Sequence, residues 1–270
     1  MEDRWPVKVR PLPWYGGKQR KSAWLHSLIP WCKDSTYIEP FGGMASLLCY
    51  RAPVDCEIFN DLDFCVWNWW RVIRDHGECF GSKIEAMPLS EKDFEWAVKT
   101  VNDKSMSAMD RALAFHILAE NSVTGALANP ALRVWYTKGS RRSWNLNRIQ
   151  DLAERFWKVQ LLCRPAEKIL ARTAEIKNAV IYADPPYFTA RTEAYNVCEF
   201  NIPEWTELFK SQRGQVAVSG YSDEWDHLGW DRHELEVMST VGRGECQLKT
   251  EVLWTNYDAC ADHAIGGLFA

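Results

Sequence analysis

Short apolar runs alternate with helix-like segments at the start of the chain and recur near its end. Residues 36–38, 56–60 and 180–183 are β-rich runs that end in polar, glycine or proline turns, a pattern typical of buried strands. Residues 44–50 and 64–74 have the pattern of helices. The order strand, turn, helix and strand predicts a parallel sheet with crossover helices.

The C-terminal third continues this pattern. Residues 215–219 and 251–256 predict two more strands, and residues 233–238 a third. Residues 239–250 are rich in glycine and polar side chains, which predicts a mobile loop. Residues 188–201 lack clear periodicity and also predict a long loop, which is more often functional than accidental.

The middle of the chain has a different pattern, in which helix-like segments predominate. Residues 90–101, 110–120 and 148–159 predict three helices, the second of them capped by Asp110. We therefore expect a mostly helical insertion of residues 77–158 in an α/β fold.

Length and composition agree with this division. A chain of 270 residues and 31.2 kDa fits one large domain or a domain with an insertion. The expected catalytic sheet domain comprises residues 1–76 and 159–270. No apolar stretch is long enough to cross a membrane, and the first residues lack the apolar region of a signal peptide. We therefore expect no membrane partner.

The cysteines indicate a reducing compartment. Nine cysteines without a CxxC spacing argue against a disulfide framework and against structural zinc. Cys260 and His263 are a lone pair without partners for a metal site. The sequence thus predicts a cytoplasmic protein without a structural metal.

The net charge of −4 does not by itself indicate a nucleic-acid partner, but the distribution of charge does. Residues 133–148 carry five cations, three aromatic side chains and no acidic residue. Such a segment suits phosphates and base edges, although it is also compatible with a solvated loop. The candidate DNA-binding residues are Arg133, Lys138, Arg141, Arg142, Asn145 and Arg148.

Asp184-Pro185-Pro186-Tyr187 follows the predicted strand at residues 180–183. The prolines fix φ and remove two backbone donors, so the loop is stiff and its carbonyl groups stay available. Asp184 and the Pro185 carbonyl offer two acceptors, and Tyr187 offers a flat face. This set suits a planar base with an exocyclic amino group, whereas an ordinary proline turn with a buried tyrosine is the alternative.

Two glycine turns and a carboxylate indicate a second ligand. The segment Trp14–Lys18 contains Gly16-Gly17 but lacks the spacing of a phosphate-binding P-loop. Glu39-Pro40-Phe41-Gly42-Gly43 places glycines at a strand-to-helix turn, where a ligand can approach the backbone closely. Asp61 ends the next strand, where a ribose diol is usually held. The spacing points to a cofactor that contains adenosine.

Taken in order, these motifs resemble the Dam-type DNA adenine-N6 methyltransferases over most of the chain. The resemblance implies a Rossmann-like methyltransferase sheet, an inserted target-recognition domain, S-adenosylmethionine as cofactor and double-stranded DNA as substrate. It implies that Asp184, Pro185 and Tyr187 handle a flipped-out adenine. The cofactor-binding residues that it implies are Trp14, Lys18, Glu39, Phe41, Gly42, Gly43, Asp61 and Asp184.

The chain departs from this family pattern at two positions. Ala45 stands where the cofactor loop usually has its final glycine, and we expect a mild effect. Pro165 stands where an acidic residue often precedes the next helix, which affects the expected contacts to the adenine ring of the cofactor.

Three other functions share part of this sequence pattern. An RNA base methyltransferase shares related motifs, and a catalytically decayed DNA-binding protein would keep the fold. A zinc deaminase is disfavoured because the chain lacks the PCxxC motif.

Overall fold

The computed structural model describes residues 10–14, 16–87, 90–122, 130, 146–186, 201–241 and 245–259. The chain forms two compact units. The first, called the helical unit, comprises residues 1–22, 43–53 and 61–163. The second, called the sheet unit, comprises residues 23–42, 54–60 and 164–270. Each is described by itself.

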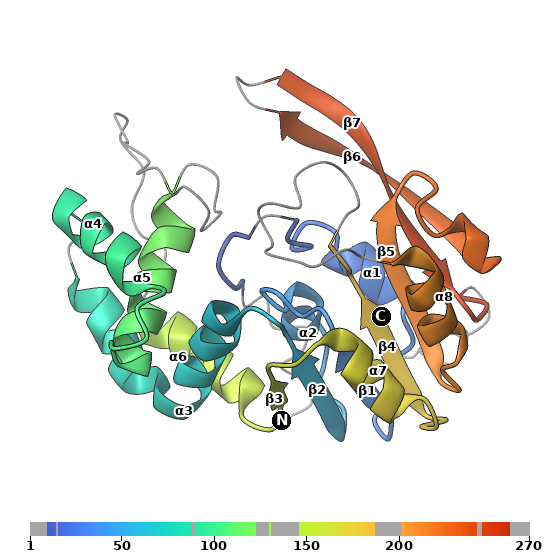
Figure 1. The fold of residues 1–270 in the computed structure, drawn as a ribbon, viewed down its shortest axis with the longest axis horizontal. Coiled ribbons are helices and arrows are strands. Elements are labelled where there is room, and N and C mark those ends of the chain that lie inside the picture. Colours follow the sequence, from blue (N-terminus) through green and yellow to red (C-terminus); the bar gives the residue numbers. More distant parts are fainter. Residues whose placement is uncertain are drawn as a thin grey trace. The chain divides into compact units, whose positions relative to one another are not determined.

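The strands form a seven-stranded sheet in the order β3-β2-β1-β4-β5-β7-β6 (Figure 1). The strands β1, β2, β4 and β5 run parallel, and β7 pairs antiparallel to both β5 and β6. This arrangement confirms the α/β, Rossmann-like fold. The strand bounds are β1 Thr36–Glu39, β2 Cys56–Asn60, β3 Gln160–Leu162, β4 Ala179–Ala183, β5 Gln215–Tyr221, β6 Asp231–Val241 and β7 Glu245–Thr255.

The strand β4 lies between β1 and β5, and all five of its residues are buried. Its register pairs Ile181 with Ile38 of β1 and with Val216 of β5. A parallel strand that is covered on both faces has a continuous run of apolar residues, which is why β4 could be predicted from the sequence. Because β1 and β4 are parallel neighbours, the turns that follow Glu39 and Ala183 leave the same edge of the sheet.

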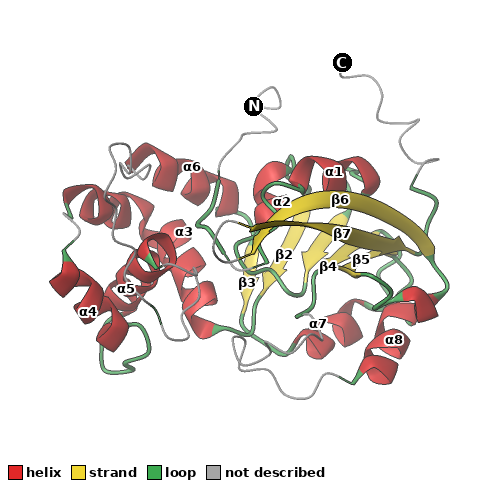
Figure 2. Cartoon of the chain, turned by 90° about the horizontal axis from the view of Figure 1, so that it is seen from above, coloured by secondary structure: helices red, strands yellow, loops and turns green. Residues whose placement is uncertain are grey.

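Helices cover both faces of the sheet unit. Figure 2 shows α1 on one face of the sheet and α7 and α8 on the other. These helices are α1 Ser22–Leu28, α7 Ala166–Thr173 and α8 Ile202–Lys210. Among the described residues, no helix has the length and hydropathy that a bilayer crossing requires.

The predicted mobile loop at residues 239–250 is wrong, because most of this segment lies in the β6–β7 hairpin. The pairing runs from Asp231 with Thr255 to Val241 with Glu245. Only residues 251–255 of β7 also pair with β5, so the hairpin extends past the end of β5 (Figure 1). A ribbon outside the core tolerates polar side chains on both faces, which weakens the alternation that would reveal a strand.

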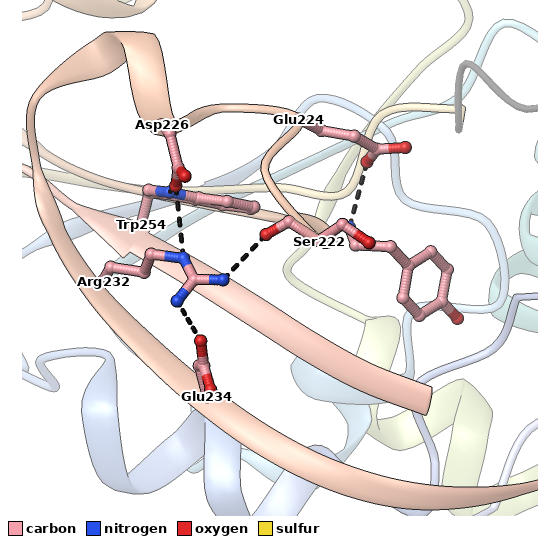
Figure 3. Close-up of polar contacts among 7 residues, drawn as sticks. Ser222, Glu224, Asp226, Arg232, Glu234 and Trp254 are labelled. Carbon is pink, nitrogen blue, oxygen red and sulfur yellow. Dashed lines mark hydrogen bonds and ion pairs between the residues drawn. The ribbon is translucent and has the colours of Figure 1, made fainter. Parts of the chain in front are cut away.

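A polar network fixes the base of this hairpin (Figure 3). The Arg232 guanidinium contacts Asp226 at 3.2 Å, donates to the Ser222 carbonyl at 2.9 Å and bonds to Glu234. The indole Nε1 of Trp254 donates to the same Asp226 carboxylate at 2.8 Å. The turn after β5 and the hairpin therefore share one set of contacts.

The helical unit contains α2 Ser46–Tyr50, α3 Phe64–Ala86, α4 Glu91–Thr100, α5 Ala108–Asn121 and α6 Leu146–Phe156. Ser90 caps α4 in a reciprocal capping box with Asp93. The cap of α5 is Ser107, whose hydroxyl accepts from the Asp110 amide, so the predicted cap at Asp110 is wrong. Sequence signals did locate these helices.

Close contact between α3 and α6 explains why α3 extends beyond its predicted end. The helix continues through a local distortion at His76. A Cβ on Gly77 would lie 2.8 Å from the Ala153 Cβ, and one on Gly81 would lie 2.7 Å from Leu146 Cδ1. Because these two glycines, one turn apart, have no side chains, α6 can pack closely against α3. Buried Trp70 stacks on Phe156 of α6 with ring centroids 3.8 Å apart.

Candidate active site

In the helical unit, a carboxylate closes a glycine turn. Gly43 has a φ of +49°, a conformation that favours glycine. Its amide donates to Asp61 Oδ2 at 2.7 Å, and the Asp63 amide donates to Asp61 Oδ1 at 2.8 Å. The Gly43 carbonyl in turn accepts from Trp70 Nε1 at 3.0 Å. Asp61 is thereby fixed by both of its oxygens, each of which retains acceptor capacity.

Burial raises the pKa of Asp61 to about 7. Desolvation is the dominant cause, and the two backbone donors from Asp63 and Gly43 oppose it. A group that donates hydrogen bonds to the ionised carboxylate would lower this pKa. Asp61 therefore suits a ligand with hydroxyl donors, such as a ribose diol.

Trp14 lies beside the same turn. The position of a Cβ on Gly43 would be 3.6 Å from Trp14 Cδ1. The Trp14 ring also packs against Phe115 of α5, with centroids 5.5 Å apart. Trp14, Gly43 and Asp61, three of the predicted cofactor-binding residues, are thus brought together in one unit.

Lys18 follows a tight turn in which the Gly17 amide donates to the Trp14 carbonyl at 3.0 Å. The Lys18 side chain is buried, and its ammonium donates to the Gly16 carbonyl at 3.3 Å. In the described structure, Lys18 therefore stabilises the turn that carries Trp14.

In the sheet unit, the turn after β1 has a strict steric requirement. A Cβ on Gly42 would lie 2.1 Å from the ring of buried Phe59 in β2. Phe41 packs against Trp205 of α8, with ring centroids 5.2 Å apart. Glu39, the last residue of β1, is buried and accepts a hydrogen bond from the Tyr37 hydroxyl at 2.8 Å. The turn is therefore held closely by its own unit.

Asn60 is a positioning residue whose role the sequence analysis missed. Its Nδ2 donates to the carbonyls of Pro40 and Arg164, both at 2.9 Å, and its Oδ1 accepts from the Arg164 amide at 3.0 Å. The side chain is fully buried. A buried amide that joins two loops to the end of β2 through satisfied hydrogen bonds fixes their conformations. The available signal was a polar residue at the end of an apolar strand.

Asp184, Pro185 and Pro186 directly follow β4, at the edge of the sheet that also carries the Pro40–Gly42 turn. Asp184 is half-buried and Pro185 is buried. The Tyr182 hydroxyl of β4 and Ser219 Oγ of β5 are 2.9 Å apart. Tyr187, the last residue of the motif, lies outside the described residues.

Of the candidate DNA-binding residues, only Arg148 belongs to the described part of the chain. Its Nε donates to the Arg10 carbonyl at 2.8 Å, and its Nη2 bonds to the same carbonyl and to that of Pro11 at 3.2 Å. Desolvation lowers the pKa of Arg148 to about 10. The other candidates, which lie outside the described residues, are Arg133, Lys138, Arg141, Arg142 and Asn145.

The two departures from the family pattern occupy defined positions. Ala45 precedes α2 with a φ of 47° and a ψ of 41°, the left-handed conformation that glycine adopts most easily. Pro165 precedes α7 and makes no capping hydrogen bond through its side chain. Among the described residues, no group of three or more His, Cys, Asp and Glu side chains could hold a metal ion.

Comparison with known proteins places the chain in a family. No curated protein matches the chain. A solved structure from Listeria monocytogenes, described as a class I S-adenosylmethionine-dependent methyltransferase, aligns with 11% identity and a TM-score of 0.36. The alignment covers 93% of this chain but 62% of that one. The model of the D12 class N6 adenine-specific DNA methyltransferases matches residues 14–217, well over half of the chain. The chain belongs to this family.

Proposed function

We propose that the protein transfers the methyl group of S-adenosylmethionine to the N6 amino group of adenine in double-stranded DNA. The observation that carries this proposal is the family match, which spans every motif from Trp14 to Asp184. The position of Asp184 supports it, because ligands of open α/β sheets bind at the carboxyl ends of the strands.

The described residues fit the proposed cofactor. The turn requires glycine at position 42 because of the Phe59 ring and favours glycine at position 43 because of its positive φ, and Asp61 offers acceptors for the ribose hydroxyls. Trp14 covers the turn, with Lys18 holding the segment that carries it. Glu39 and Phe41 complete the proposed cofactor-binding set, together with Asp184.

The cofactor supplies an electrophilic methyl group on a sulfonium, so no covalent intermediate with the enzyme is needed. The protein has to make adenine N6 a better nucleophile, because the lone pair of that nitrogen is delocalised into the ring. Asp184 and the Pro185 carbonyl accept the two N6 hydrogens in this proposal, which favours a tetrahedral nitrogen. Tyr187 stacks on the base, which has to leave the duplex to reach the site.

DNA recognition is proposed for the insertion at residues 77–158. Its cations and aromatic side chains between residues 133 and 148 provide groups for phosphates and base edges. Within this proposal, residues 1–76 and 159–270 form the catalytic domain.

The test uses purified protein, labelled S-adenosylmethionine and either duplex DNA or structured RNA. After digestion to nucleosides, we expect the label in N6-methyldeoxyadenosine. Label in cytosine, or in RNA but not in DNA, would overturn the proposal. Cofactor binding without transfer to any nucleic acid would favour the decayed DNA-binding protein.

A further inference from the structure

Arg148 has contacts that a residue reading DNA does not need. It lies in the first turn of α6 and is the last residue of the basic segment 133–148. Its guanidinium nevertheless bonds to the main-chain carbonyls of Arg10 and Pro11, more than 130 positions earlier in the sequence. These contacts fix the segment that leads to Trp14.

A second side chain holds the same segment. Gln19 Nε2 donates to the Pro11 carbonyl at 2.9 Å and to the Leu12 carbonyl at 3.1 Å. Leu12 is fully buried, which anchors the segment further. The Arg10 carbonyl thus accepts from Arg148, the Leu12 carbonyl accepts from Gln19, and the Pro11 carbonyl accepts from both.

The fixed segment ends at the candidate cofactor turn. Two residues after Leu12, Trp14 packs against Phe115 of α5 and lies beside Gly43. Gly43 in turn donates to Asp61. Every contact in this series lies within the helical unit.

We propose that Arg148 is a positioning residue that holds Arg10–Trp14 in place, so that Trp14 covers the Gly43 turn and the cofactor binds a preformed site. This role differs from the DNA contact expected from the sequence. It rests on the proposed function, because it takes Trp14 and the Gly43 turn as part of the cofactor site.

The chemistry of arginine fits this role. A planar guanidinium presents several N–H donors in a fixed fork, whereas a lysine ammonium is a flexible point charge. Two neighbouring carbonyls require such a fork, but a phosphate would also accept lysine. The variant R148K therefore separates the two roles, and R148M removes both.

The experiment titrates the DNA-free full-length protein with S-adenosylhomocysteine by calorimetry. We expect R148M to bind about tenfold more weakly than the parent protein, in line with the loss of a charged hydrogen bond. R148K should show most of this loss. Q19M, which removes the other donor to the Pro11 carbonyl, should weaken binding in the same direction. K83M removes an exposed cation from α3 of the same unit and should bind like the parent.

DNA binding by R148M is then measured at several salt concentrations, and thermal melting verifies that the variant is folded. A phosphate contact would reduce the slope of log affinity against log salt by about one, whereas a positioning role leaves the slope unchanged. Cofactor affinity equal to the parent in R148M would overturn the inference. If R148M does not fold, the same comparison in Q19M decides. A parent protein that binds no S-adenosylhomocysteine would instead refute the proposed function.

Discussion

The titration of Asp61 predicts how cofactor affinity depends on pH. In the protein without ligand, burial holds the Asp61 pKa at about 7. Ribose hydroxyls donate to the ionised carboxylate, so binding should favour ionised Asp61. Affinity is therefore expected to be full above pH 7 and to fall as the pH drops through this value.

The size of the effect follows from the hydrogen bonds that the ligand adds. A hydrogen bond to a charged group contributes about 1.5–3 kcal/mol. At 1.36 kcal/mol per pKa unit, this places the pKa of Asp61 in the complex about one to two units below its value in the free protein. As the pH falls from the pKa of the free protein to that of the complex, the dissociation constant should rise by up to about tenfold per pH unit. Below both pKa values it should become constant.

The assay uses 5′-methylthioadenosine, which has the ribose diol but lacks the titratable amino-acid part of the cofactor. Calorimetry in two buffers of different ionisation enthalpy should show release of a fraction of a proton on binding near pH 6.5. The 2′,3′-dideoxy analogue is the control and should bind with little dependence on pH. Equal affinity of 5′-methylthioadenosine at pH 5.5 and pH 8, or proton uptake on binding, would refute the role assigned to Asp61.

Three further predictions concern other parts of the site. Ala45→Gly should raise the free energy of unfolding by up to about 1 kcal/mol, since relief of the left-handed backbone (about 1–2 kcal/mol) exceeds the loss of a buried methyl (about 0.8 kcal/mol); a lower urea midpoint would contradict this. Gly42→Ala should lower stability by about 1–3 kcal/mol through overpacking against Phe59, and Phe59→Leu should restore part of it. Asp184→Ala should abolish methyl transfer and weaken S-adenosylhomocysteine binding far less, and substantial turnover would remove Asp184 from its catalytic role.

The strands around the motifs were predictable because parallel strands in the middle of a sheet are buried on both faces. Val180, Ile181 and Ile38 lie in such strands, and their apolar runs end where the polar motifs begin. The same patterns predicted the turns at Gly42 and Asp184. Geometry at this sheet edge therefore follows from local sequence.

Structure outside these strands depends on partners that local sequence does not show. The strand β3 has three residues, which is too short to give a periodic signal. The helix α3 continues beyond residue 74 because Gly77 and Gly81 admit α6, which lies far along the chain. Contacts of this kind explain why element types were predicted better than element ends.

The adjacent residues Asn60 and Asp61 have different roles: Asn60 fixes two loops, and Asp61 can accept hydrogen bonds from a ligand. Asn60 uses all of its described hydrogen bonds to tie the loops at Pro40 and Arg164, so the end of β2 is held by contacts that involve no ligand. Asp61, the next residue, keeps acceptor capacity beyond its two backbone donors. Removing the Asp61 carboxylate would leave the Gly43 and Asp63 amides without that acceptor, so a substitution disturbs the turn as well as ligand binding. Titration removes only the charge, and it therefore measures the contribution of Asp61 to the cofactor more directly than a mutation does.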